Sequence, residues 1–107
     1  MSTKLMELVK KSLVKLHGID SCKRMADMPA SDVMFSILRE NVENTYSKYK
    51  GKLPDEQYEQ FIEDIFQIYK EYKLSLDKVE EREYGKLYGD YAERIVEVIH
   101  KYGVNAD

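Results

Sequence analysis

Residues 54–73, PDEQYEQFIEDIFQIYKEYK, are the stretch that decides the fold. Apolar and aromatic residues recur there every three or four positions, which is the spacing of one face of an α-helix. Acidic residues and one lysine fall on the opposite side, so the pattern predicts a core helix with an acidic exterior. The core face holds Tyr58, Phe61, Ile62, Ile65, Phe66, Ile68, Tyr69 and Tyr72, and the outer face holds Glu56, Glu59, Glu63 and Lys70.

Two helical patterns precede this stretch. The boundary between the second of these helices and residues 54–73 is set by Gly51 and Pro54. Gly51 suits a left-handed helix end, and Pro54 suits the first turn of the next helix. Over residues 32–49, Val33 and Ile37 make a second apolar surface that could meet the first helix or another protein. The main inward face of that helix holds Phe35, Leu38, Val42, Tyr46 and Tyr49. The first helix is expected to end near Gly18, and its inward face holds Leu5, Val9, Leu13 and Leu16.

The last helical pattern runs from about residue 76 to residue 102, and Gly103 suits its carboxyl-terminal end. Near Ser75 the apolar pattern changes phase without a glycine or proline, so one long bent helix through this point is the alternative. Its apolar arc holds Tyr84, Leu87, Tyr88, Tyr91, Ile95, Val98, Ile99 and Tyr102, flanked by the small residues Gly85, Gly89, Ala92 and Val96.

These patterns predict an all-α protein, a compact antiparallel bundle of about four helices. With 107 residues the chain is too short for two cores of ordinary size, so residues 1–107 are expected to form one domain. Residues 17–31 are expected to be a connector that could be mobile, with a short helical turn over residues 20–28.

Charge is distributed unevenly along the chain. Residues 1–31 contain six basic and three acidic residues, whereas residues 54–107 contain seven basic and fourteen acidic residues. The lone Cys22 excludes an intrachain disulfide and a cysteine-based zinc site, and an incidental cysteine is favoured over a reactive thiol. Charged residues interrupt the first apolar residues, and no apolar run reaches ~18 residues, so a cytoplasmic protein is the default expectation.

Two patterns in the sequence could be taken for catalytic or metal-binding groups. Glu97 and His100 have the Glu-x-x-His spacing of di-metal bundles, but a second such motif is absent and both turn away from the apolar arc. The acidic groups within residues 59–64 and 80–83 fall on outward faces, where nothing shifts their pKa values toward acid–base catalysis. We therefore expect no metal, no cofactor and no enzymatic activity.

The tyrosines beside the small residues are the main candidates for recognition. Two glycines inside a helix should each cost ~1 kcal/mol relative to alanine, so close approach by another helix or a ligand would explain them. Tyrosine rings and hydroxyls suit protein interfaces and nucleobases. The interaction or ligand candidates are Tyr84, Gly85, Tyr88, Gly89, Tyr91, Ala92 and Val96, and the acidic-face candidates are Glu56, Glu59, Glu63, Asp90, Glu93 and Glu97.

The sequence therefore predicts a non-enzymatic protein–protein interaction module, such as an adaptor, inhibitor or regulatory subunit, with a homodimer as one outcome. Binding of a small molecule or nucleotide by the tyrosines, with Lys86 or Arg94, is the alternative. A further alternative is an acidic mimic of nucleic acid that blocks a basic partner. The acidic balance disfavours direct binding to nucleic acid, and the lack of aromatic anchors on the first helix disfavours a membrane.

Overall fold

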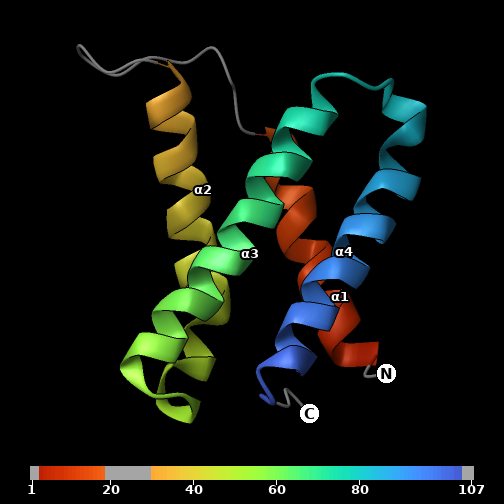
Figure 1. Cartoon of the computed structure of the whole chain (residues 1–107). Coiled ribbons are helices and arrows are strands. Elements are labelled where there is room, and N and C mark those ends of the chain that lie inside the picture. Colours follow the sequence, from red (N-terminus) through yellow and green to blue (C-terminus); the bar gives the residue numbers. More distant parts are fainter. Residues whose placement is uncertain (1–2, 19–29, 105–107) are drawn as a thin grey trace.

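The computed structural model describes residues 3–18 and 30–104, and Figure 1 shows how they are arranged. Within these residues the chain folds into four α-helices joined by 3₁₀ turns and contains no strand, which confirms the expected all-α bundle. The elements in chain order are α1 (Thr3–Val14), η1 (Lys15–Gly18), α2 (Ala30–Tyr46), η2 (Ser47–Lys52), α3 (Asp55–Leu76), η3 (Glu81–Glu83) and α4 (Tyr84–Lys101).

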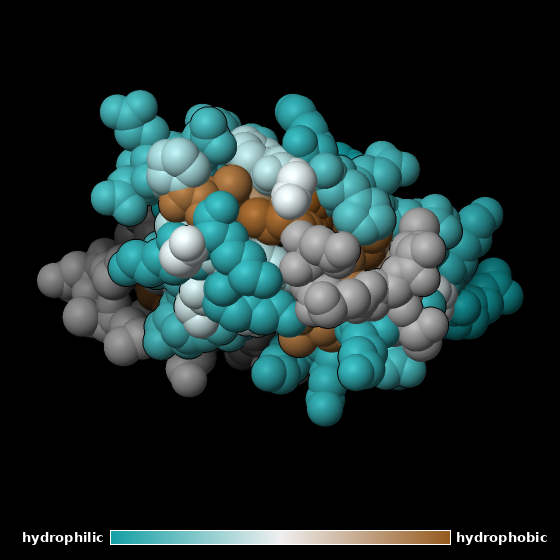
Figure 2. Space-filling model, turned by 90° about the horizontal axis from the view of Figure 1, so that it is seen from below, coloured by the Kyte–Doolittle hydropathy of each residue, from teal (hydrophilic) through white to brown (hydrophobic). Residues whose placement is uncertain are grey.

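α3 lies at the centre of the bundle, between α2 and α4, while α1 packs against α4 and its continuation η1 reaches α3. Consecutive helices run in opposite directions, so α1 begins and α4 ends at the lower end of the molecule in Figure 1. The Cα atoms fill a flattened volume of 37 × 33 × 15 Å. Viewed from that lower end, the surface is mostly hydrophilic, with hydrophobic residues visible between hydrophilic ones (Figure 2).

The inward faces expected from the helical spacing meet in one core. Burying such a side chain contributes ~1.5–3 kcal/mol, so these contacts hold the four helices together. Phe35, Tyr58 and Phe66, which the spacing placed inward, are only partly buried at the margin of the core. The buried apolar residues common to prediction and structure include Leu5, Val9, Leu13, Leu16, Leu38, Val42, Tyr46, Tyr49, Phe61, Ile62, Ile65, Ile68, Tyr69, Tyr72, Ile95 and Ile99.

A chain of buried hydroxyl groups ties three helices together inside this core. The hydroxyl of Tyr69 on α3 is hydrogen-bonded to Ser12 Oγ on α1 and lies 3.1 Å from the hydroxyl of Tyr46 on α2. Ser12 Oγ also lies 3.2 Å from Thr45 Oγ1. Burial raises the pKa of both tyrosines, so their hydroxyls stay neutral and satisfy one another away from water.

The expected break near Ser75 is confirmed, and the alternative of one long bent helix is wrong, as is a last helix that begins near residue 76. α3 ends at Leu76 and α4 begins only at Tyr84. The intervening turn is held by backbone and side-chain hydrogen bonds, including one from the Glu80 N–H to a Glu83 carboxylate oxygen at 3.3 Å. This local capping contact replaces the glycine or proline that the sequence lacks.

The glycines at the two predicted helix ends behave differently. Gly103 has a positive φ of 74°, as expected for a left-handed helix end. Gly51 does not, because η2 continues past it to Lys52; that part of the prediction is wrong. Pro54 immediately precedes the first residue of α3 and accepts a hydrogen bond from the Tyr58 N–H at 2.8 Å. The expected connector, its helical turn and Cys22 fall largely within residues 19–29, outside the described residues.

Candidate functional site

The three candidate tyrosines of α4 lie at the end of the bundle where α1 ends and α3 gives way to α4. Each is partly buried with a neighbour against its ring. The His17 ring meets Tyr84 edge-on, with centroids 4.9 Å apart, and Lys10 Nζ lies 5.9 Å from the Tyr88 centroid. Tyr91 packs against an aromatic ring of α3 at 5.3 Å. The fold therefore brings the predicted tyrosines next to Lys10 and His17. Their sequence separation gives no indication of this proximity.

A histidine–tyrosine pair anchors this cluster. His17 Nε2 and the Tyr72 hydroxyl lie 2.7 Å apart. Burial lowers the pKa of His17, and the nearby positive charge of Lys73 lowers it further. Burial also raises the pKa of Tyr72, with smaller contributions from Tyr88 and Tyr84. Both shifts favour the neutral forms, so the hydrogen bond joins two uncharged side chains near neutral pH.

Lys73 is a buried charged residue that the sequence analysis missed. Its side chain is only 4% exposed, and its Nζ donates to the carbonyl oxygen of Leu16 at 3.2 Å. A cation at the carboxyl-terminal carbonyls of a helix is favoured by the helix dipole. The sequence signal for its burial is its spacing, because Lys73 follows Tyr69 by four positions and precedes Leu76 by three, which places it on the same helix face as these two core residues.

The small-residue strip of α4 divides into two parts. Ala92 and Val96 are fully buried core residues, whereas Gly85 is exposed and Gly89 partly exposed. A β-carbon on Gly85 would have only the Tyr88 ring nearby, at 4.0 Å, and one on Gly89 would meet no atom within 4 Å. Of the alternatives for these glycines, close packing by a helix of the same chain is therefore excluded for the described residues, and approach by another molecule stays a prediction.

A groove lies between α2 and the first half of α3, on the opposite side of α3 from α4. Its volume is about 910 Å³. Three of the six acidic-face candidates line it, on the first turns of α3. The lining residues are Arg39, Glu43, Ser47, Lys50, Asp55, Glu56, Tyr58, Glu59, Gln60, Ile62 and Glu63.

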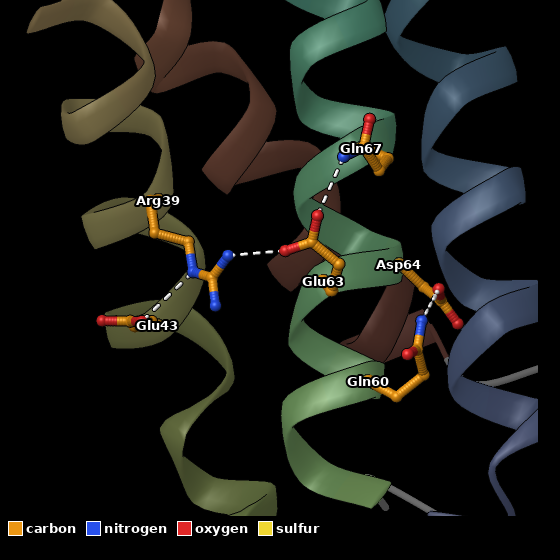
Figure 3. A network of polar contacts seen from close by, with 6 residues as sticks. All are labelled: Arg39, Glu43, Gln60, Glu63, Asp64 and Gln67. Atoms are coloured by element: carbon orange, nitrogen blue, oxygen red, sulfur yellow. Dashed lines mark hydrogen bonds and ion pairs between the residues drawn. The ribbon is translucent and has the colours of Figure 1, made fainter. Parts of the chain in front are cut away.

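An ion-pair network spans this groove, as Figure 3 shows. Arg39 of α2 places Nη1 2.7 Å from Glu63 of α3 and Nε 3.2 Å from Glu43 one helical turn away. Glu63 also accepts a hydrogen bond from Gln67 Nε2 at 2.9 Å. The Gln67 hydrogen bond, followed by Arg39, lowers the pKa of Glu63. A carboxyl held in its charged form is suited to binding cations and unsuited to proton transfer near neutral pH.

The other three acidic-face candidates lie elsewhere. Asp90, Glu93 and Glu97 are exposed on α4, away from the groove. His100 is exposed as well, and among the described residues no group of three or more His, Cys, Asp or Glu side chains could hold a metal ion. The six carboxylates thus form two separate surfaces, one on each side of the bundle.

Comparison of the chain with protein-family models, with curated proteins and with solved structures found no match. None of the helices in the described ranges is both long and apolar enough to cross a membrane.

Proposed function

We propose that this chain is a non-enzymatic protein-binding module that receives a basic segment of a partner protein in the groove between α2 and α3. The observation that carries the proposal is the charge of the groove, whose lining has five carboxylates and two cationic side chains. Such a module would act as an adaptor, inhibitor or regulatory subunit by occupying its partner's basic surface.

Glu56 and Glu59 in the lining of the groove are exposed and available to a partner. Arg39 is already neutralised by Glu43 and Glu63. In the part of the chain that the structure describes, no ion pair involves Glu56 or Glu59. Complementary charges steer a partner to such a surface and fix its register more than they add affinity.

The floor of the groove offers apolar contact as well. Ile62 is buried there and Tyr58 is half-buried. Burial, followed by the negative charge of Glu43, raises the pKa of Tyr58, so its ring carries no charge at neutral pH. A lysine or arginine of the partner can lay its aliphatic stem on this ring while its charge reaches Glu59.

A designed peptide tests the proposal. We expect a 15-residue amphipathic peptide of lysine and leucine to shift backbone amide signals of residues 39–63 in NMR titrations. The variant Glu56→Gln/Glu59→Gln should weaken binding about fivefold, since each exposed ion pair contributes roughly 0.2–1 kcal/mol.

The matched control is Asp90→Asn/Glu93→Gln, which removes the same charge from α4. Equal weakening of peptide binding by the two variants would mean that the overall charge of the protein, and not the groove, determines the affinity, and would overturn the groove proposal. Shifts confined to α4 would overturn it as well.

The two alternatives from the sequence stay predictions. The ring of Tyr84 contacts His17, that of Tyr88 lies below Lys10, and that of Tyr91 lies below Arg94 with a distance of 4.9 Å. A planar ligand would have to displace these neighbours, which is why protein binding at the groove is preferred. Native mass spectrometry with a nucleotide panel, and competition with DNA for a basic partner, would test the alternatives.

A further inference from the structure

Arg39 lies in the groove in the way that a bound ligand would. Its Nη1 donates to Glu63 Oε2 at 2.7 Å, and its Nε donates to Glu43 Oε1 at 3.2 Å (Figure 3). Its Cζ lies 5.2 Å from the centroid of the Phe66 ring. Carboxylates and an aromatic face are the groups by which proteins recognise the arginine of a partner. The groove therefore contains a formed position for a guanidinium, which the chain's own arginine fills.

The parts of this position have supports besides Arg39. Gln67 Nε2 donates to Glu63 Oε1 at 2.9 Å, and the Phe66 ring packs against the core. Lys70 Nζ also lies over this ring, at 4.9 Å from its centroid. When Arg39 moves away, the two carboxylates outnumber this neighbouring cation. The vacated position therefore attracts a cation, and little ordering of the groove is needed to bind one.

Arg39 can leave this position at small cost. Its side chain is 36% exposed, and those of Glu43 and Glu63 are 54% and 41% exposed. Water and salt weaken exposed ion pairs, so the contacts of Arg39 contribute little to the stability of the fold. Its long, unbranched stem can turn toward solvent while the backbone of α2 stays in place. The occupant of the position is therefore exchangeable.

We propose that this position is a guanidinium-binding subsite of the groove, which Arg39 fills until an arginine of the basic partner segment replaces it. The inference rests on the proposed function, and it adds that the partner segment carries an arginine at this point. A guanidinium lies flat on the Phe66 ring while its edges donate to carboxylates of two helices. The ammonium group of a lysine is a compact, strongly hydrated charge that cannot do both. The groove therefore prefers arginine to lysine, and Arg39 competes with the partner.

Two matched peptides and one variant test the subsite. The first peptide is the lysine and leucine peptide described above, and the second has arginine in place of each lysine. Arg39→Ala empties the subsite, so it should bind the arginine peptide about fivefold more tightly than the wild-type chain does. The lysine peptide should gain less than about twofold from the same substitution. Isothermal titration calorimetry measures the dissociation constants.

Lys50→Ala is the matched control, because it removes a cation from the lining of the same groove but not from the subsite. It should strengthen the binding of both peptides by the same factor. Arg39→Ala/Phe66→Leu keeps the charge of Arg39→Ala and removes the aromatic face. It should lose most of the gain for the arginine peptide and bind the lysine peptide as Arg39→Ala does, which also shows that it is folded.

The outcomes separate this inference from the proposed function. If Arg39→Ala strengthens the binding of the two peptides equally, or if Lys50→Ala changes the preference for arginine as much, the subsite is overturned and the proposed function stands. If neither peptide binds the wild-type chain, both are overturned. In NMR spectra of Arg39→Ala, the arginine peptide should shift the ring protons of Phe66 more than the lysine peptide does, and equal shifts would also overturn the subsite.

Discussion

α3 packs on both neighbours through buried side chains, and the clearest difference between the two contacts is at their exposed margins. Toward α2, Tyr46 packs against Phe61 and Tyr69 in the core. At the margin Arg39 and Glu63 lie 2.7 Å apart with 36% and 41% of their side chains exposed. Lys70 Nζ also lies over the rings of Phe35 and Phe66, at 5.3 and 4.9 Å. Exposed ion pairs add little stability, so this margin can exchange its partners at small cost.

Toward α4, hydroxyl groups and buried apolar side chains make the contact, together with an exposed ion pair between Arg94 and Glu71 at 2.6 Å. The Tyr102 hydroxyl donates to Asp64 Oδ2 at 2.7 Å, and the hydroxyls of Ser75 and Tyr91 lie 3.2 Å apart. Ile95 of α4 is fully buried. Buried side chains on both sides of α3 hold the bundle together, whereas the exposed margin toward α2, which lines the groove, is free to serve recognition.

The largest effect on the free energy of unfolding should come from truncating a fully buried apolar side chain of α4. We expect Ile95→Ala to lower the free energy of unfolding by about 3 kcal/mol, through lost transfer energy and a residual cavity. Ile37→Ala on α2 makes the same chemical change at a partly buried position and should cost about 1 kcal/mol. Urea denaturation compares the two; equal losses would mean that burial does not set the cost of the truncation.

Lys73 extends the buried side of α3 to the end of α1. Lys73→Ala removes the donor to the Leu16 carbonyl and leaves a cavity, so we expect a loss of about 2 kcal/mol in chemical denaturation. Lys73→Met retains the apolar stem and should lose about half as much. If the methionine variant were as unstable as the alanine variant, the charge and not the packing would dominate.

The sequence predicts the inward face of α3 well because burial there follows helical spacing alone. Phe61, Ile65 and Tyr69 lie on that face whatever the neighbouring helix contributes. The burial of Lys73 depends instead on a carbonyl 57 residues earlier in the chain. Local spacing places Lys73 near the core, and only the position of α1 explains why a cation is accepted there.

The candidate site on α4 shows the same division between local and tertiary information. Spacing identified Tyr84, Tyr88 and Tyr91 as one surface, and the fold keeps them together. Helical spacing also predicts that Ala92 lies beside the apolar arc. In the structure α1 packs on α4, and Ala92 is fully buried. Which side of an amphipathic helix is covered depends on its neighbours, and the sequence of one helix does not contain that information.

The hydrogen bond between Tyr102 and Asp64 should have a smaller effect and a signature at alkaline pH. We expect Tyr102→Phe to cost about 1 kcal/mol at neutral pH, where Asp64 loses one of its two donors. Burial and the Asp64 carboxylate raise the pKa of Tyr102 from 10.0 to about 12.

Because the folded pKa of Tyr102 is the higher one, the unfolded chain loses this proton first as the pH rises. The contribution of Tyr102 is therefore complete below pH 10 and is lost as the pH approaches 12. Thermal melts of both proteins should converge over that range. Parallel pH profiles would contradict the link between this hydrogen bond and alkaline unfolding.

The ion pair on the α2 side should have the smallest effect, and its signature should appear at the opposite end of the pH scale. The pKa of Glu63 is lowered from 4.5, so the unfolded chain binds its proton more readily. Its contribution is present above pH 4.5 and is lost as the pH falls below that value. Glu63→Gln should cost about 0.5 kcal/mol at neutral pH and flatten the acid limb of the stability profile. Glu40→Gln, an exposed glutamate on the same bundle, is the matched control, and identical profiles for the two variants would mean that the Arg39 ion pair contributes nothing to folding. In that case the α2 side of α3 would be held by apolar and cation–π contacts and by the buried contact between the hydroxyls of Tyr46 and Tyr69, and the charges of the groove would be fully available to a partner.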